Sequence, residues 1–369
     1  MKKPYQLACD NIANSLSRFF NRIFSKIHVE KDPLYNPSDF NDAIVMVVST
    51  HRSQADYFLL GWVLYNNGVK YLRIAAGDNL TSFPILGKKF LSFGAFPVKR
   101  ELAFKKNYVR SLCAEVVKMM ENGEPILLFP EGGRSYTGKM MELKGGILIA
   151  SIIAQWKNPN KKVYILPCSI SYERLPELKY FKFLQKGREL RKNKNFIKKK
   201  LGNFYYFGAD LIAFGKFLAC GWLGISQGEV FIDIGKPLAI NELIDINSNY
   251  NSHARDEFSS HQNSVRILGQ KIYDIFISLY RILPSHILAK ILKEKQSISL
   301  NDAVSSINNI LSQLKNQKRN TKSLDMLSPE EIVQKGIKNL LKEKAISLSK
   351  NKIKVKNQDI IDYYSSSVY

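Results

Sequence analysis

A histidine and an aspartate five positions apart, His51 and Asp56, directly follow the short apolar run at residues 43–50. On one helix, residues five apart are about 140° apart around the axis and do not face each other. They can meet if His51 lies on a loop and Asp56 lies in the first turn of the next helix. The carboxylate would then accept one imidazole N–H and leave the other ring nitrogen as a general base. The alternative is a loop histidine beside an unrelated aspartate.

A second group of polar residues follows two further apolar runs. It consists of Lys99 and Arg100 after residues 91–98, and Glu131, Gly132, Gly133, Arg134 and Ser135 after residues 126–130. The three cations can hold a phosphate, since each charge-assisted hydrogen bond contributes roughly 1.5–3 kcal/mol. Glu131 suits a substrate hydroxyl or one of the basic side chains. The N–H groups of the two glycines can face either a phosphate or an oxyanion.

The segment that begins at Gly133 has the spacing of a nucleotide-binding P-loop, with Gly138 and Lys139 at the required positions. A P-loop continues with Ser or Thr, whose hydroxyl holds magnesium, and this chain has Met140 there. The sequence therefore favours a phosphate-handling loop of another kind.

The elements around these residues alternate between strands and helices. Apolar, β-branched runs predict strands at 43–50, 71–77, 125–130, 163–172 and 230–235. A helical pattern at 108–123 ends at Gly123. This alternation predicts an α/β fold with a mostly parallel sheet flanked by helices. Ligands bind such sheets beyond the carboxyl ends of the strands, which is where the polar groups collect.

The pattern divides the chain into three parts. Residues 1–40 are predicted to be an amphipathic helical lead-in that either packs on the protein or lies on a membrane surface. Residues 41–240 form the predicted α/β domain. Residues 241–369 are predicted to be a C-terminal helical region without further strands, in which Ser328 and Glu331 open a helix as a capping box.

The net charge of +23 over 369 residues predicts an anionic partner, although the richness in Lys, Asn and Ile also fits A+T-rich coding. The densely basic run 186–202 is either a solvated helix face or a contact for anionic lipid or an acidic acyl carrier protein. No RNA-binding signature or zinc module supports a nucleic-acid partner. The four cysteines have no ligand spacing, so no metal site is expected.

Residues 203–225 are the most membrane-like part of the chain. They are long enough to span a bilayer, but Asp210 and Lys216 lie inside them, and each costs about 3 kcal/mol at mid-bilayer. The segment is therefore predicted to be buried or interfacial.

Four blocks of this sequence, in order, resemble the motifs of the glycerolipid acyltransferases that carry an HxxxxD motif. The blocks are HRSQAD at 51–56, GAFPVKR at 94–100, FPEGGRSYTGK at 129–139 and ILPCSISYE at 165–173. Together with LPSHILAKIL at 283–292, they look most like the bacterial glycerol-3-phosphate acyltransferases. The resemblance implies that residues 41–240 are the acyltransferase domain. It also implies that His51 is the base, Asp56 its orienting partner, and Arg134, Lys99 and Arg100 a phosphate clamp.

The function implied by the resemblance is glycerol-3-phosphate O-acyltransfer, which forms lysophosphatidate in phospholipid biosynthesis. The donor would be acyl-CoA or acyl-ACP (acyl carrier protein), with no cofactor. The protein would act at the cytoplasmic face of the cell membrane, held peripherally on anionic lipid. Tyr136 stands where these enzymes usually carry a second arginine, so lysophosphatidate remains an alternative acceptor. A non-catalytic basic protein that binds membrane or nucleic acid is the more distant alternative.

Overall fold

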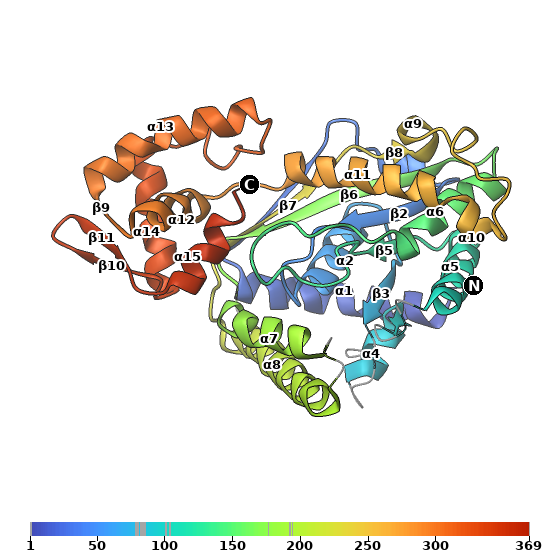
Figure 1. Cartoon of the computed structure of the whole chain (residues 1–369), viewed down its shortest axis with the longest axis horizontal. Coiled ribbons are helices and arrows are strands. Elements are labelled where there is room, and N and C mark those ends of the chain that lie inside the picture. Colours follow the sequence, from blue (N-terminus) through green and yellow to red (C-terminus); the bar gives the residue numbers. More distant parts are fainter. Residues whose placement is uncertain are drawn as a thin grey trace.

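The computed structural model describes residues 2–368 apart from 78–80, 82–85, 100, 101, 103, 104, 176, 192 and 194. An eight-stranded sheet runs through the molecule in the order β1-β7-β6-β2-β5-β3-β4, with β8 beside β6. All its strand pairs are parallel except β6 with β7 and β6 with β8. Helices cover both faces of the sheet (Figure 1). The predicted α/β fold with a mostly parallel, helix-flanked sheet is confirmed.

The five predicted strands are all present, and three more complete the sheet. Its strands are β1 (Lys26–Lys31), β2 (Ile44–Ser49), β3 (Arg73–Gly77), β4 (Ala95–Val98), β5 (Ile126–Leu128), β6 (Val163–Tyr172), β7 (Glu229–Ile234) and β8 (Leu238–Ala239). Pro97 has no N–H to donate to a neighbouring strand, and it lies in β4, at the edge of the sheet, where that loss is tolerated.

Two apolar cores lie on opposite faces of the sheet, and β2 supplies both. Its Val45 and Val47 face one core, which includes residues of α1 (Pro4–Ile23), α2 (Asp56–Asn66) and α8 (Phe196–Leu223). The intervening Ile44, Met46 and Val48 face the other core. The helices of that second core are α5 (Lys106–Glu121), α6 (Gly145–Lys157) and α11 (Gln262–Leu279). Burial on both faces explains why β2 reads as an unbroken apolar run.

The N-terminal lead-in is only partly helical, so the prediction for residues 1–40 needs correction. Helix α1 is present, but Lys26–Lys31 form β1, which pairs in parallel with β7 at the edge of the sheet. The short helix η1 (Pro37–Phe40) follows. Residues Asn11, Asn14, Arg18 and Arg22 of α1 are exposed, and its apolar side packs against other helices, including α8. Helix α1 is therefore a packing helix in this structure.

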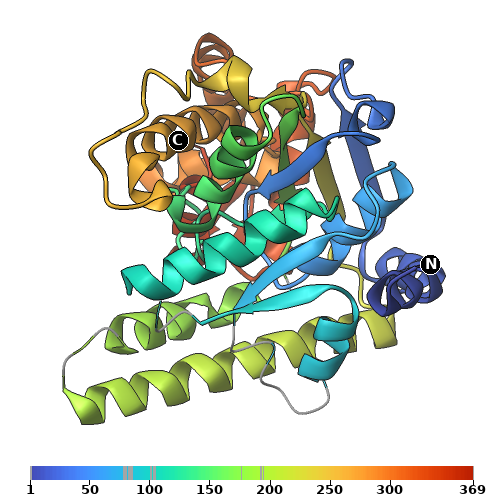
Figure 2. The same cartoon turned by 90° about the vertical axis from the view of Figure 1, so that its right-hand side faces the viewer.

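Two long helices form a hairpin below the sheet, α7 (Phe181–Arg191) and α8, preceded by η3 (Leu178–Tyr180) (Figures 1 and 2). The membrane-like segment 203–225 falls mainly within α8. Among the described residues, no helix is long and apolar enough to cross a bilayer. Helix α4 (Leu86–Ser92) lies beside this hairpin in both views.

The C-terminal region contains helices and a small second sheet. Its helices are α9 (Ile240–Leu243), α10 (Glu257–Ser260), α11, α12 (Pro284–Lys295), α13 (Leu300–Asn316), α14 (Pro329–Lys342) and α15 (Gln358–Ser365). The capping box predicted at the start of α14 is confirmed. The absence of strands after about residue 240 was predicted wrongly, because β9 (Ser297–Ser299), β10 (Ile346–Ser349) and β11 (Lys352–Val355) form an antiparallel sheet. Strands of three or four residues are too short to show a clear alternation.

Candidate active site

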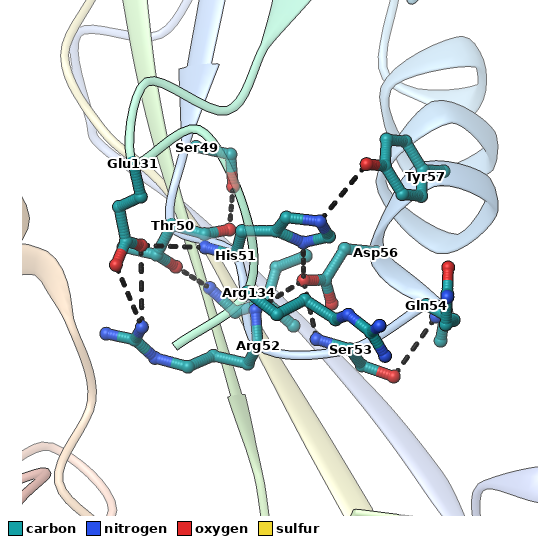
Figure 3. Close-up of polar contacts among 12 residues, drawn as sticks. Ser49, Thr50, His51, Arg52, Ser53, Gln54, Asp56, Tyr57, Glu131 and Arg134 are labelled. Atoms are coloured by element: carbon teal, nitrogen blue, oxygen red, sulfur yellow. Dashed lines mark hydrogen bonds and ion pairs between the residues drawn. The ribbon is translucent and has the colours of Figure 1, made fainter. Parts of the chain in front are cut away.

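His51 and Asp56 meet at the carboxyl end of β2, as their spacing predicted. His51 lies on the loop after the strand, and Asp56 is the first residue of α2. Nδ1 of His51 is 2.8 Å from Oδ2 of Asp56 (Figure 3). The same carboxylate accepts the N–H groups of Arg52 at 2.6 Å and Ser53 at 2.9 Å, and the hydroxyl of Tyr172. These donors hold the carboxylate in place, and its contact with Nδ1 directs the other ring nitrogen away from it.

The other nitrogen of the imidazole faces the hydroxyl of Tyr57. Nε2 of His51 is 3.2 Å from that hydroxyl (Figure 3). The imidazole ring also stacks on Phe129, with 4.3 Å between the ring centroids. Only 2% of His51 is exposed. Burial lowers the pKa of His51 below its usual 6.5, although Asp56 acts in the opposite direction. Around neutral pH the imidazole is therefore unprotonated, which is the form a general base requires.

Glu131 holds the neighbouring loop together. One carboxylate oxygen accepts the backbone N–H of His51 at 3.0 Å, and the other accepts that of Met141 at 3.0 Å. The guanidinium of Arg52 donates to both oxygens, at 3.4 and 3.2 Å (Figure 3). Of the two roles open to Glu131 in the sequence, this arrangement fits the one in which it positions a basic side chain.

Arg134 is buried, and acidic residues surround its guanidinium. Nη2 pairs with Asp210 of α8, and Nη1 is 3.7 Å from Oε1 of Glu177. Among the residues that the structure describes, Nη1 has no hydrogen-bond partner, and neither does the other carboxylate oxygen of Glu177. Burial raises the pKa of Glu177, and the charge of Arg134 opposes that rise. In this conformation two carboxylates contact the guanidinium of Arg134, which was predicted to bind a phosphate.

The rest of the loop after β5 is held by hydrogen bonds within the loop and to the loop after β2. The N–H of Gly132 donates to the carbonyl of Phe129 at 2.9 Å, so it is not directed at a ligand. Ser135 donates its N–H to the carbonyl of His51 and its hydroxyl to the carbonyl of Lys139. Gly132 and Gly133 have φ of 69° and 159°, which favour glycine. Of the two glycines, Gly133 remains the candidate N–H donor.

Lys99, the other predicted phosphate cation that the structure describes, does not join this cluster. Lys99 is exposed at the end of β4, and its backbone N–H donates to the hydroxyl of Tyr108. Strands β3 and β5 lie between β4 and β2, which places Lys99 roughly 14 Å to one side of the β2 end. Arg100 lies outside the described residues.

The P-loop-like spacing has a packing explanation. In a P-loop the Lys leads directly into a helix, whereas here α6 begins at Gly145, six residues after Lys139. Gly138 has a φ of 82°, and a Cβ there would lie 2.0 Å from the carbonyl oxygen of Tyr363 in α15. Met140 is buried against Arg52. The loop therefore connects the site to the C-terminal region and does not form a nucleotide cradle.

An apolar pocket lies between α1 and α2, and Tyr57, the neighbour of His51, lines it. Its lining includes Leu16 of α1 and Tyr57, Phe58, Gly61 and Trp62 of α2. Tyr57 therefore contacts both the pocket and Nε2 of His51. The arrangement places an apolar pocket next to the tyrosine that contacts the imidazole.

Sequence reasoning missed four side chains of this site, namely Tyr57, Tyr172, Glu177 and Asp210. Tyr57, which follows Asp56 directly, and Tyr172, in the fourth motif block, carried no signal of their own. Asp210 did carry one, because an acidic residue in an apolar helix needs a buried partner. That partner is Arg134, together with Gln54, which donates to Asp210 at 2.7 Å. Within the described ranges, no group of three or more His, Cys, Asp or Glu could hold a metal ion.

Comparisons with known proteins find acyltransferases. Residues 27–171 match the family model described as acyltransferase. The glycerol-3-phosphate acyltransferase of Alteromonas mediterranea is 32% identical over 230 residues, which are 62% of this chain and 26% of that protein. The glycerol-3-phosphate acyltransferase of Hamiltonella defensa is 32% identical over 202 residues, which are 54% of this chain and 25% of that protein. The chain thus spans about a quarter of the length of these relatives.

Among solved structures, the chain is similar to the 1-acyl-sn-glycerophosphate acyltransferase PlsC from Thermotoga maritima. The match has a TM-score of 0.35 at 16% identity and covers 74% of this chain and 84% of that one.

Proposed function

From the acyltransferase-family domain that residues 27–171 form, we propose that this protein moves a fatty acyl group from a thioester to glycerol 3-phosphate. The donor is acyl-CoA or acyl-ACP, and the product is lysophosphatidate. The relatives named glycerol-3-phosphate acyltransferase support this acceptor. A thioester is already activated, so the reaction needs no cofactor.

The His51–Asp56 pair carries the proposal. Nε2 takes the proton of the acceptor hydroxyl while the hydroxyl oxygen attacks the thioester carbon, and Asp56 at Nδ1 stabilises the imidazolium that forms. The tetrahedral intermediate then collapses, the C–S bond breaks, and the thiolate takes the proton back from the imidazolium. A positioned base of this kind is worth about 10²–10⁴-fold in rate.

The apolar pocket suits the acyl chain of the donor. Each buried CH₂ contributes about 0.8 kcal/mol, so an apolar channel beside Tyr57 is an effective way to hold a fatty chain. A chain in the pocket would bring the thioester toward Tyr57, whose hydroxyl contacts Nε2 of His51. The acceptor then approaches from the opposite side, where Arg134 supplies the positive charge for its phosphate.

We place the protein at the cytoplasmic face of the cell membrane, held peripherally on anionic lipid, and we expect no nucleic-acid partner. The net charge of +23 and the exposed lysines at the start of α8 support a basic, membrane-facing protein. The acyl donor and the product both carry fatty chains, which also favours a membrane location.

An acceptor competition assay tests the proposal. The protein receives acyl-CoA or acyl-ACP with an equal mixture of glycerol 3-phosphate and lysophosphatidate, and the two products are separated. We expect lysophosphatidate to be the main new product. Preferential acylation of lysophosphatidate would show that lysophosphatidate is the acceptor. Absence of both products would favour the alternative that the protein is a non-catalytic binding protein.

A further inference from the structure

Helix α8 has an outer face made of apolar residues. Every exposed residue from 204 to 225, a stretch that the structure describes throughout, is apolar or glycine. Its large side chains are Phe204, Phe207, Leu211, Ile212, Leu218, Trp222, Leu223 and Ile225. Phe204 is 77% exposed and Trp222 is 80% exposed. Figure 2 shows α8 as the lowest helix of that view, on the outside of the molecule. The half-buried Lys216 lies within this stretch. An apolar face of this length marks an interaction surface.

The inner face of the same helix reaches the candidate active site. Asp210 immediately precedes the outward-facing pair Leu211 and Ile212, and its carboxylate pairs with Arg134 and accepts from Gln54. Any movement of α8 away from the sheet therefore separates Asp210 from Arg134. Glu177 lies in the segment that leads to the hairpin. Its carboxylate accepts the hydroxyl of Ser53 and the N–H of Gln54, and it thereby holds the loop between β2 and α2.

The site is closed to an anion in this conformation. His51, Arg52 and Arg134 are all buried. The cluster contains the carboxylates Asp56, Glu131, Glu177 and Asp210 against the guanidiniums Arg52 and Arg134. A phosphate can reach Arg134 only if Asp210 moves aside, because two anions do not share one buried guanidinium at low cost.

Charge identifies the partner of the outer face as an anionic bilayer. Residues 181–225 contain ten Lys or Arg and two Asp or Glu. The exposed lysines 198, 199 and 200 stand at the start of α8 beside the exposed Phe196 and Ile197. A second copy of this chain would bring the same excess of positive charge against it, whereas anionic head groups attract it.

We propose that α8 docks through its outer face on an anionic bilayer, and that docking draws Asp210 off Arg134 and opens the acceptor site. One part of this inference rests on the proposed function, namely that the anion which replaces Asp210 at Arg134 is the phosphate of the acceptor. Docking and opening are measured without any acyl transfer, so their failure is distinct from failure of the proposed function.

Vesicle flotation tests the docking surface. The full chain is mixed with vesicles of phosphatidylcholine containing 30% phosphatidylglycerol, and separately with phosphatidylcholine alone. We expect binding to the anionic vesicles, lost in the double variant Phe204→Glu/Trp222→Glu and kept in Met326→Glu, whose side chain is 91% exposed on another surface. Replacing lysines 198–200 by Gln should weaken binding roughly fivefold per lysine. Flotation of Phe204→Glu/Trp222→Glu at the wild-type level would overturn the proposal. A wild-type dimer that the same double substitution dissociates would also overturn it, because the outer face would then bind a second copy of the chain.

Hydrogen exchange tests the coupling. On anionic vesicles, the backbone amides of residues 51–56 and 131–135 should exchange at least about tenfold faster than in solution, while those of α14 stay unchanged. Asp210→Asn should raise exchange at the same amides without vesicles and leave flotation intact, since its side chain faces inward. Vesicle-bound protein whose site amides exchange as slowly as in solution would show that docking does not open the site.

Discussion

The imidazole of His51 experiences two opposing influences. Its burial beside Phe129 and Tyr57 disfavours the charged form, and the carboxylate of Asp56 favours it. The net result is a lowered pKa, so the base is ready for a proton while Asp56 still stabilises the cation that forms in the reaction.

The pH dependence of the reaction follows from this balance. Protonation of His51 removes the base, and its pKa lies below 6.5, so kcat/KM should fall only as the pH drops below that value. Asp56 raises the pKa of His51, so Asp56→Asn should move the acidic midpoint to still lower pH and reduce the plateau. A pH profile of both proteins checks this, and an acidic midpoint above pH 7 in the wild type would contradict it.

The sequence predicted the pairing of His51 with Asp56, because a loop followed by a helix start leaves few other arrangements. It did not predict that Arg134 is paired with carboxylates. Asp210 lies 76 positions away from Arg134 in the chain, and such a contact depends on how the α7–α8 hairpin packs under the sheet. Local pattern carries no information about that packing. The Lys99 prediction depended on strand order, which sequence likewise does not reveal.

The loop between β5 and α6 gains its shape from the C-terminal helix. Gly138 approaches the backbone of Tyr363 so closely that no side chain fits, and its positive φ adds strain for any other residue. The loop that carries Glu131 and Arg134 is therefore braced by α15.

Substitution at Gly138 should destabilise the protein strongly. Gly138→Ala combines a left-handed backbone with a collision against a backbone oxygen, and we expect a loss of at least about 3 kcal/mol in the free energy of unfolding. Gly123→Ala is the matched control, because its φ is also positive but no atom lies within 4 Å, and it should cost about 1–2 kcal/mol. Denaturant unfolding measures both, and equal losses would refute the packing role of Gly138.

The pocket between α1 and α2 should set the preferred acyl chain length. A Cβ at Gly61 meets only one atom of Ile74, at 3.9 Å, so a leucine there extends into the pocket. Gly61→Leu should lower kcat/KM for a 16-carbon donor about tenfold relative to an 8-carbon donor, because about two methylenes lose their place. Gly269→Leu in α11, with no atom within 4 Å, should leave the ratio unchanged. An unchanged ratio in Gly61→Leu would remove the pocket as the acyl site.

The elements that the sequence predicted well are those with both faces covered. Strands β2 and β6 are mostly apolar and almost fully buried, and the sequence predicted both. The edge strand β1, in which Val29 is partly exposed, was not predicted. The polar His28 of β1 contacts Glu229 of β7 at 2.8 Å. Such polar residues made the sequence of β1 look like a continuation of the helical lead-in.

The C-terminal region is joined to the sheet by a buried ion group. Arg281, between α11 and α12, donates to Asp233 of β7 and to Glu30 of β1. A second pair, Lys182 of α7 with Asp359 of α15, joins the C-terminal region to the α7–α8 hairpin at 3.0 Å and is exposed. The two connections differ in burial, and burial decides how much free energy of unfolding is lost when each is broken.

Breaking the buried connection should cost far more than breaking the exposed one. Arg281→Ala leaves Asp233 buried without its counter-ion, so the free energy of unfolding should fall by about 3–5 kcal/mol. Lys182→Ala should change it by no more than about 1 kcal/mol. Thermal and denaturant unfolding of both variants measure the difference. Similar losses would show that Arg281 does not fasten the C-terminal region to the sheet.

The most direct test of the whole account is acylation of radiolabelled glycerol 3-phosphate by the wild-type protein and by His51→Ala, with circular dichroism of both. The account predicts labelled lysophosphatidate from the wild type and a rate at least about 10²-fold lower from a folded His51→Ala. A folded His51→Ala that keeps the wild-type rate would show that this histidine is not the base.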